Sequence, residues 1–143
     1  MTDVQASIGI EQLKRIDHVL DEKVVLSRFY TKVFSKTKHV TPPYVPDYVD
    51  RPSWYMYAIV VSEKIRDALV DYLNSVNIET RLSFPPVHLQ PYHSKELRCR
   101  PEDYPSALRS FKTFLDIPIW AGMTRKNQAL VTKNINLFVT DGE

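Results

Sequence analysis

The longest apolar run in the sequence is Trp54-Tyr55-Met56-Tyr57-Ala58-Ile59-Val60-Val61. Aromatic and β-branched side chains of this kind suit a pleated strand, and in this run they occupy both faces. A strand that is apolar on both faces normally lies inside a sheet that is covered on both sides. We therefore predict a central strand over residues 54–61. The run is far too short to cross a bilayer, so we expect no membrane partner.

On the C-terminal side of this strand, the apolar spacing predicts a helix over residues 63–76. Ser62 is placed to cap its start, and Asn77 is a suitable stop. A short second strand is expected over residues 78–82. The helix should turn one face inward, formed by Ile65, Leu69, Tyr72, Leu73 and Val76.

The rest of the C-terminal half alternates between loop and helix. Prolines favour a loop over residues 83–104, followed by a helix at 105–114 with Pro105 at its first position. Residues 115–119 read as extended. Thr124 should cap a last helix over 125–135, which residues 136–139 either extend or follow as a short strand. This helix is expected to bury Leu130, Val131 and Ile135.

On the N-terminal side, residues 35–53 form a proline-rich connection, and residues 3–34 read as one long helix capped by Thr2 or Asp3. Ile8 and Ile10 lie on different faces, so the first turns are apolar nearly all round. Such a helix is normally buried. We therefore expect this end to be exposed or self-associated in the isolated chain. The helical stripe comprises Val4, Ile8, Leu13, Ile16, Leu20 and Val24.

The whole pattern is α+β: a small antiparallel sheet packed by helices, with a long N-terminal helix. The chain has 143 residues, of which 43% are hydrophobic and 25% charged, which fits a single globular domain over residues 1–143. Its parts are the long helix (1–34), the connection (35–53) and the α+β portion (54–143). The net charge of +2 argues against a nucleic-acid partner.

Several kinds of chemistry have no sequence signal here. Gly9, Gly122 and Gly142 are too far apart for a phosphate-binding loop. Cys99 is the single cysteine, so no internal disulfide can form, which suits a reducing, cytoplasmic location, and no signal peptide is evident. No catalytic group is assigned. The histidines fit no common zinc pattern, and a metal site from His88, His93 and Cys99 is the weaker interpretation.

The residues with most chemical potential lie in Ile78-Glu79-Thr80-Arg81-Leu82-Ser83-Phe84-Pro85-Pro86-Val87-His88-Leu89-Gln90-Pro91-Tyr92. Arg81 can bind a carboxylate or phosphate with two hydrogen bonds. His88 and Gln90 can bond hydroxyl groups, and Tyr92 can stack or hydrogen-bond. The alternative is ordinary: Arg81 pairs with a surface acid and His88 caps a turn. The residues taken one by one favour that alternative.

Three ordered stretches resemble one family. MTDVQASIGIEQLKRID at 1–17 is similar to M-T-D-x-Q-A-A-x-G-x-x-Q-L-x-x-L-D of the DegT/DnrJ/StrS sugar-nucleotide aminotransferases. NIETRLSFPPVHLQPY at 77–92 resembles their G-I-x-T-R-x-x-x-x-P-L-H-x-Q-P-x-Y. FLDIPIWAGMTRKNQALVTKNI at 114–135 resembles L-S-L-P-x-x-x-x-L-T-x-x-x-Q-x-x-V-x-x-x-I.

The resemblance implies the small C-terminal domain of a pyridoxal 5′-phosphate (PLP) enzyme of fold type I that works as a homodimer. Such enzymes transfer an amino group, usually from glutamate, to a keto sugar nucleotide. Arg81, His88, Gln90 and Tyr92 then correspond to loop positions near the substrate or the cofactor, and we assign them to substrate binding. Asn77 stands where the family often has glycine, which implies a left-handed helix end.

The same resemblance implies that the cofactor-holding parts are missing. The family's Schiff-base lysine, its aspartate at the pyridinium nitrogen and most phosphate-binding residues lie upstream of the motif in which Met1 falls. None of the lysines of this chain, Lys14 and Lys23 included, can be assigned that lysine's role, so we expect no PLP binding by this chain alone. The alternatives are a non-catalytic interaction or dimerisation module derived from the family, and an unrelated small α+β binding domain.

Overall fold

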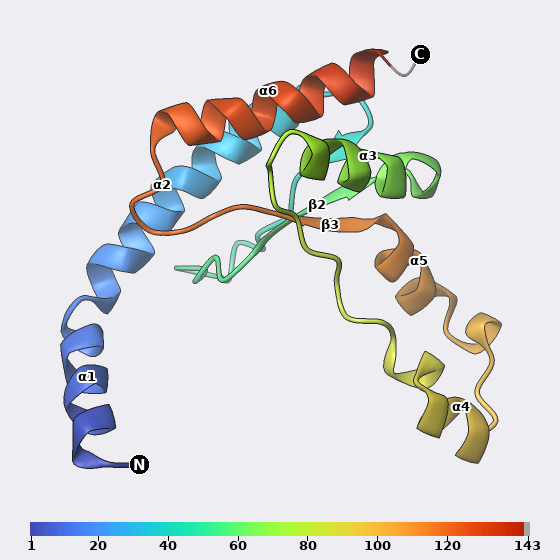
Figure 1. Cartoon of the computed structure of the whole chain (residues 1–143), viewed down its shortest axis with the longest axis horizontal. Helices are drawn as coiled ribbons and strands as arrows, with labels where there is room; N and C mark the ends of the chain where they lie inside the picture. Colours follow the sequence, from blue (N-terminus) through green and yellow to red (C-terminus); the bar gives the residue numbers. More distant parts are fainter. Residues whose placement is uncertain (142–143) are drawn as a thin grey trace.

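A central body and two projecting arms make up the molecule (Figure 1). The computed structural model describes residues 1–141, so Gly142 lies outside the described residues. The body consists of a three-stranded sheet and the helices α2 (Ile16–Phe34), α3 (Glu63–Ser75) and α6 (Arg125–Asp141). One arm is α1 (Asp3–Lys14). The other is the segment from about residue 83 to residue 113, and both arms point to the same side of the body.

The sheet is antiparallel, as predicted, with strand order β1-β2-β3. Its strands are β1 (Val40–Thr41), β2 (Tyr57–Val61) and β3 (Phe114–Ile117). The central position of β2 confirms the role predicted for the long apolar run. The strand begins only at Tyr57, however, because Trp54 has a φ of 48°, which turns the chain before the ladder starts. Strand β1 lies within the connection, where no strand was predicted.

Burial along β2 alternates. Tyr57, Ile59 and Val61 are buried, whereas Ala58 and Val60 are only half-buried. The expectation of full cover on both faces is therefore wrong for the second face. An antiparallel sheet tolerates one partly solvated face.

The predicted strand over residues 78–82 is also wrong. Only one residue pair forms there: Arg81 exchanges both backbone hydrogen bonds with Asp116 of β3, at 3.1 and 2.9 Å. Pro85 and Pro86 follow closely, and proline has no N–H to donate to a ladder. The chain instead leaves the sheet after Leu82.

The core lies where α2, α3 and α6 pack on the sheet. The Gln128 side chain, fully buried in α6, donates a 2.9 Å hydrogen bond to the carbonyl of Leu26 in α2. The buried aromatic and aliphatic residues of this core include Tyr30, Phe34, Tyr57, Ile59, Leu69, Leu73, Leu115 and Ile135.

The last helix begins as predicted and runs further. The Thr124 hydroxyl accepts from the Asn127 N–H at 3.2 Å, and α6 continues through residues 136–139. Val131 and Ile135 are buried, but Leu130 is 51% exposed. The prediction for Leu130 is wrong because it faces the side of α6 that lines an open pocket rather than the core.

Helix α3 confirms its predicted caps. Ser62 accepts from the Lys64 N–H at 3.3 Å, and Leu69 and Leu73 are buried. At the other end, Asn77 has a φ of 59°. The Ile78 N–H bonds the Leu73 carbonyl at 2.8 Å, and the Asn77 N–H bonds the Asn74 carbonyl at 3.0 Å. This is a Schellman ending, and it is the left-handed helix end that the resemblance implied.

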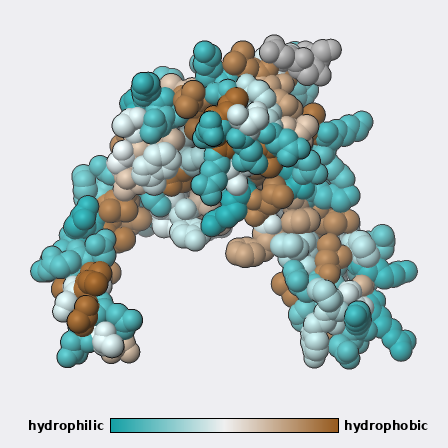
Figure 2. Space-filling view, in the orientation of Figure 1, coloured by the Kyte–Doolittle hydropathy of each residue, from teal (hydrophilic) through white to brown (hydrophobic). Residues whose placement is uncertain are grey.

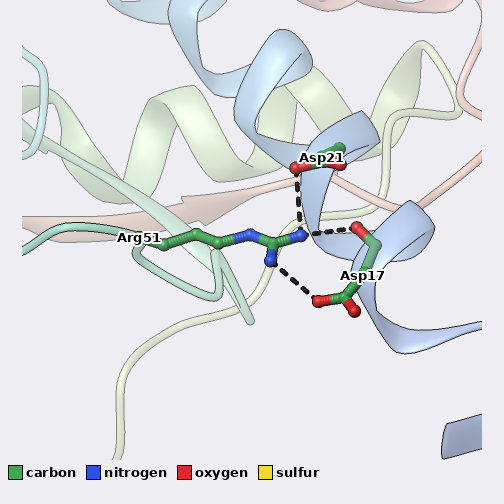
Figure 3. Close-up of polar contacts among 3 residues, drawn as sticks. All are labelled: Asp17, Asp21 and Arg51. Carbon is green, nitrogen blue, oxygen red and sulfur yellow. Dashed lines mark hydrogen bonds and ion pairs between the residues drawn. The ribbon is translucent and has the colours of Figure 1, made fainter.

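The long N-terminal helix is two helices. Thr2 and Gln5 form a capping box at the start of α1, but the helix breaks at Arg15, whose φ and ψ are −103° and −3°. No proline or glycine marks the break. Arg51, from the connection, binds the first two turns of α2 through the Asp17 carboxylate at 2.8 Å, the Asp17 carbonyl at 2.6 Å and Asp21 at 2.9 Å (Figure 3).

The apolar start of this helix is exposed in the isolated chain, as predicted. None of the residues 3–14 of α1, all within the described part of the chain, is buried. The exposed large apolar residues of α1 and of the first position of α2 are Val4, Ile8, Ile10, Leu13 and Ile16. We call this set the N-terminal apolar surface.

The second arm was predicted as a loop over residues 83–104. It instead contains the short helices η1 (Val87–Leu89), α4 (Pro91–Glu96) and η2 (Pro101–Asp103) before α5 (Pro105–Thr113), which matches the predicted helix. Pro91, Pro101 and Pro105 each stand at the start of a helix. Prolines that looked like helix breakers therefore act as helix starters here.

Candidate functional site

The Schellman end of α3 positions the first candidate residue. It turns the chain so that Ile78 is buried and Arg81 lies beside Asp116 on β3. The Arg81 side chain is exposed, and its guanidinium carbon lies 5.8 Å from the centre of the Tyr55 ring. No ion pair involves Arg81 among residues 1–141, so the simple pairing with a surface acid is not what the structure shows.

A pocket of about 570 Å³ opens beside Arg81, between the sheet edge and α6. Its polar members include Thr80, Arg81, Asp116 and Asn127, and its aromatic members are Tyr55 and Trp120. Asp116 is only 6% exposed. Burial raises the pKa of its carboxyl group, and the positive charge of Arg81 partly opposes that rise. We call this cavity the Arg81 pocket.

Two polar atoms in the Arg81 pocket have no partner. Asp116 Oδ1 and Thr80 Oγ1 are both buried, and neither makes a hydrogen bond within residues 1–141. A buried oxygen left without a donor costs about 1–3 kcal/mol. The sequence reasoning missed both residues, although a charged residue inside the apolar stretch FLDIPI was a visible signal.

His88 lies in a different pocket, of about 380 Å³, on the second arm. Its ring packs on Tyr104 at a centroid distance of 4.7 Å. Its Nε2 atom is buried and has no hydrogen-bond partner in the described chain, so His88 does not cap a turn through this nitrogen. His93 and Cys99 line the same pocket. No three potential ligands among residues 1–141 are arranged to hold a metal ion.

Gln90 and Tyr92 are both on the surface of the arm. Gln90 is exposed at the N-terminus of α4 and makes no side-chain capping bond. Tyr92 is 70% exposed and meets the His93 ring edge-on at 5.4 Å. The four predicted substrate-side residues therefore do not converge on one pocket of this chain. They are strung out from the sheet edge along the arm.

The described helices include none that is long and apolar enough to cross a membrane.

Comparison with proteins of known sequence gives a family for this architecture. The model of the DegT/DnrJ/EryC1/StrS aminotransferase family matches residues 1–136. The spore coat polysaccharide biosynthesis protein SpsC of Bacillus subtilis is 31% identical over 129 residues, which are 87% of this chain and 33% of SpsC. GDP-perosamine synthase of Caulobacter vibrioides is 30% identical over 128 residues, again 87% of this chain and 33% of the relative.

Solved structures share the fold at lower identity. The aminotransferase TlmJ from Streptoalloteichus hindustanus superposes with a TM-score of 0.88 at 22% identity, over 99% of this chain and 37% of TlmJ. Helicobacter pylori PseC, an aminotransferase of pseudoaminic acid biosynthesis, gives 0.89 at 16% identity, over 99% of this chain and 38% of its own. The chain spans about a third of the length of these relatives, and it belongs to the DegT/DnrJ/EryC1/StrS aminotransferase family.

Proposed function

We propose that this chain supplies the substrate side of a PLP-dependent aminotransferase that acts on keto sugar nucleotides in the cytoplasm. In this proposal Arg81, His88, Gln90 and Tyr92 face the sugar nucleotide, and glutamate is the amino donor. The cofactor is held by a larger domain that packs against this chain, and the chain is inactive without it.

The observation that carries the proposal is the position of the second arm. It leads from Arg81 at the sheet edge to Tyr92 on α4, and it points to the same side as α1. Figure 2 shows a wide hollow between the two arms. The predicted substrate-side residues are spread along this arm and form no common binding site within the chain. A domain seated in the hollow would face them and complete such a site.

The named relatives support the chemistry. SpsC belongs to polysaccharide biosynthesis, and another relative, from Campylobacter jejuni, is a transaminase of a UDP-linked amino sugar, 26% identical over 92% of this chain. A sugar aminotransferase from Streptococcus pneumoniae with the same fold has been solved in a PLP form. A family with such members makes a sugar-nucleotide substrate the best-supported choice.

The residues of the two pockets do not fit PLP by themselves. PLP enzymes hold the cofactor as a Schiff base with lysine, and neither the Arg81 pocket nor the His88 pocket is lined by a described lysine. Lys14 pairs with Glu11 at 2.6 Å, and Lys23 donates to the Trp54 carbonyl at 3.2 Å. The cofactor therefore belongs on the partner domain in this proposal.

The test is to reconstitute the enzyme from two pieces. The chain is mixed with the separately produced N-terminal two thirds of SpsC, together with PLP, glutamate and a keto sugar nucleotide, and amino-sugar formation is measured. We expect product only from the mixture. Arg81→Gln and His88→Ala should each lower the rate, whereas Arg109→Gln, an exposed arginine on α5, should not. No product above that of the SpsC piece alone contradicts the proposal.

A second candidate function has one specific observation in its favour. Four members of the N-terminal apolar surface are exposed on α1, in which no residue is buried, and clusters of exposed large apolar groups mark interaction sites. The chain would then act as a non-catalytic dimerisation module. Sedimentation velocity over a range of concentrations tests this. Self-association that Leu13→Glu abolishes and the adjacent Gln12→Glu does not supports the module, and a monomer at every concentration excludes it.

A further inference from the structure

The helical layer formed by α2 and α6 carries a one-sided charge. The stretches 23–46 and 117–140 contain eight of the chain's 19 Lys and Arg residues and none of its 17 Asp and Glu residues. Because the net charge of the whole chain is only +2, the remaining residues are net acidic. The near-neutral composition therefore conceals a strongly cationic part of the molecule.

The fold places these two stretches side by side. Gln128 of α6 donates to the Leu26 carbonyl at 2.9 Å, and further along the layer Thr37 donates to Asn136 at 2.9 Å. The two helices therefore run parallel, with their buried faces on the core, and the helical period places the cations on the opposite faces. We call the exposed set the α2–α6 cationic surface: Arg28, Lys32, Lys36, Lys126 and Lys133.

The cations of this surface have no counterions in the described chain. None of the five side chains forms an ion pair among residues 1–141. The nearest acidic residues along α2 are Asp21 and Glu22, and both are engaged elsewhere. Asp21 pairs with Arg51 at 2.9 Å, and Glu22 accepts from the Gly122 N–H at 2.9 Å. The positive field of the surface is therefore open to solvent.

These charges do not stabilise the helices that carry them. Lys126 lies in the first turn of α6, where the helix dipole disfavours a positive charge. Arg28 and Lys32 stand four residues apart on α2, where like charges repel each other. An anionic partner on the surface would relieve this repulsion, so the arrangement is better explained by binding than by folding.

The surface lies on the side of the body away from the two arms. Figure 1 shows α6 along the edge of the body opposite the side to which the arms point. A domain seated in the hollow between the arms would therefore leave the surface uncovered. Two exposed apolar side chains accompany the cations on these helices: Val25, which is 49% exposed, and Leu137, which is 42% exposed. Lys and Arg clusters with interspersed apolar groups are typical of helices that lie on anionic membranes.

Nucleic acid is the less suitable polyanion. Proteins that bind single strands stack the bases on exposed aromatic rings. Within the described parts of α2 and α6 every aromatic ring is buried or half-buried, including Phe29 and Phe138. A bilayer, by contrast, presents an extended array of headgroups, and it requires only charge and a few apolar contacts.

We propose that the α2–α6 cationic surface docks this chain on an anionic lipid bilayer as a peripheral protein. The lysines and Arg28 meet the headgroup phosphates, and Val25 and Leu137 contact the interface between headgroups and acyl chains. The sequence-based expectation of no membrane partner rested on the lack of a spanning segment, and peripheral docking needs none. The proposal does not depend on the function proposed above, because the surface shares no residue with the substrate side.

The experiment is co-sedimentation of the full chain with lipid vesicles. Vesicles of pure phosphatidylcholine are compared with vesicles that contain about 30% phosphatidylserine, in the range that anionic leaflets attract basic segments. We expect binding to the anionic vesicles only, and we expect it to weaken as ionic strength rises, because salt screens exposed charges. Equal binding to both kinds of vesicle, or none to the anionic one, contradicts the proposal.

A matched pair of double variants locates the contact. Lys32→Gln with Lys126→Gln should weaken vesicle binding at least about tenfold, since each cation at the membrane contributes to the attraction. Lys64→Gln with Lys95→Gln removes the same net charge from exposed positions on α3 and α4 and should have little effect. Equal losses in the two variants would show attraction by net charge alone and overturn the proposal. Tighter binding of single-stranded RNA or duplex DNA than of vesicles, lost only in the first variant, would assign the surface to nucleic acid instead.

Discussion

At the scale of single residues, Arg66 is, with Asp116, one of the two charged residues that are buried among the described residues. It lies on α3 and is 6% exposed, with its guanidinium carbon 5.8 Å from the centre of the Phe111 ring. Nε lies 2.7 Å from the Asp67 carboxylate as an ion pair without hydrogen-bond geometry, and Nη1 has no partner in the described chain. A buried charge satisfied this poorly adds little stability, while its aliphatic stem still packs against the ring.

We therefore expect Arg66→Met to leave the free energy of unfolding unchanged or to raise it by about 1 kcal/mol, because it removes the buried charge and keeps the stem. Arg66→Ala should lower it by about 1–2 kcal/mol, because the packing on Phe111 is lost. Urea unfolding followed by circular dichroism measures both. A large loss of stability in Arg66→Met would show that the ion pair with Asp67 is worth more than its geometry indicates.

Asn77 provides a second residue-scale prediction. Its φ is 59°, a backbone conformation that glycine adopts without steric strain. Asn77→Gly should leave the free energy of unfolding nearly unchanged. Asn77→Ala should lower it by about 1 kcal/mol, since a Cβ is disfavoured in this region. Thermal or urea unfolding of the two variants side by side makes the comparison, and equal stability of both would contradict a strained left-handed helix end.

At the scale of elements, α1 stands apart from the body. Within residues 3–14 none is buried, and the break at Arg15 separates it from α2. Deleting residues 1–14 should therefore change the free energy of unfolding by less than about 1 kcal/mol, because little apolar area is lost from the core. Urea unfolding tests this. As a matched control, Tyr30→Ala in α2 should cost about 3–5 kcal/mol.

The sequence predicted helix ends correctly wherever a capping residue or a proline at the end itself determined them. Ser62, Asn77, Pro105 and Thr124 mark helix ends by caps that the structure confirms. The break at Arg15 was not predictable, because no proline or glycine flanks it and the Arg51 contacts on Asp17 and Asp21 come from far along the chain.

The three short helices missed in the second arm and the wrongly predicted strand after Asn77 have a common cause. Proline both starts helices and ends ladders. The choice between these roles depends on what lies on either side in space, which a sequence pattern does not contain.

The candidate site shows a similar division. The side-chain chemistry of Arg81 and His88 marked them as candidate binding residues in the sequence, and the family resemblance placed them in the substrate-side loop. That they occupy separate pockets depends on how the arm leaves the sheet. The role of Asp116 depends on a single bridge with Arg81, a long-range pairing with no local signature.

At the scale of the whole molecule, two buried tyrosines tie helix α2 to the sheet and should make stability depend on alkaline pH. Burial raises the pKa of Tyr57 to about 12, and a hydrogen bond with Thr31 at 2.7 Å lowers it slightly. Burial also raises the pKa of Tyr30, with a contribution from the Tyr57 charge. An unfolded tyrosine loses its proton near pH 10, so only the unfolded state gains from deprotonation as pH rises above that value.

Stability should therefore be constant with respect to these groups below about pH 10 and fall between about pH 10 and 12, by about 2 kcal/mol for Tyr57. Urea midpoints measured across this range test it. Tyr57→Phe should make the decline shallower, whereas Tyr48→Phe, at a position that is 85% exposed, should not. An identical decline in Tyr57→Phe would show that the transition is controlled elsewhere.

The second arm has a further consequence for how the chain can be handled. It leaves the body after Leu82 and returns at β3, so the segments on its two sides are joined in the body by the β2–β3 ladder and by the contact of α2 with α6. A protease cut or an inserted reporter peptide at the tip of the arm would leave those joints in place. The two halves of the polypeptide could thus be produced separately and recombined, which makes this domain a candidate scaffold for split-protein assays.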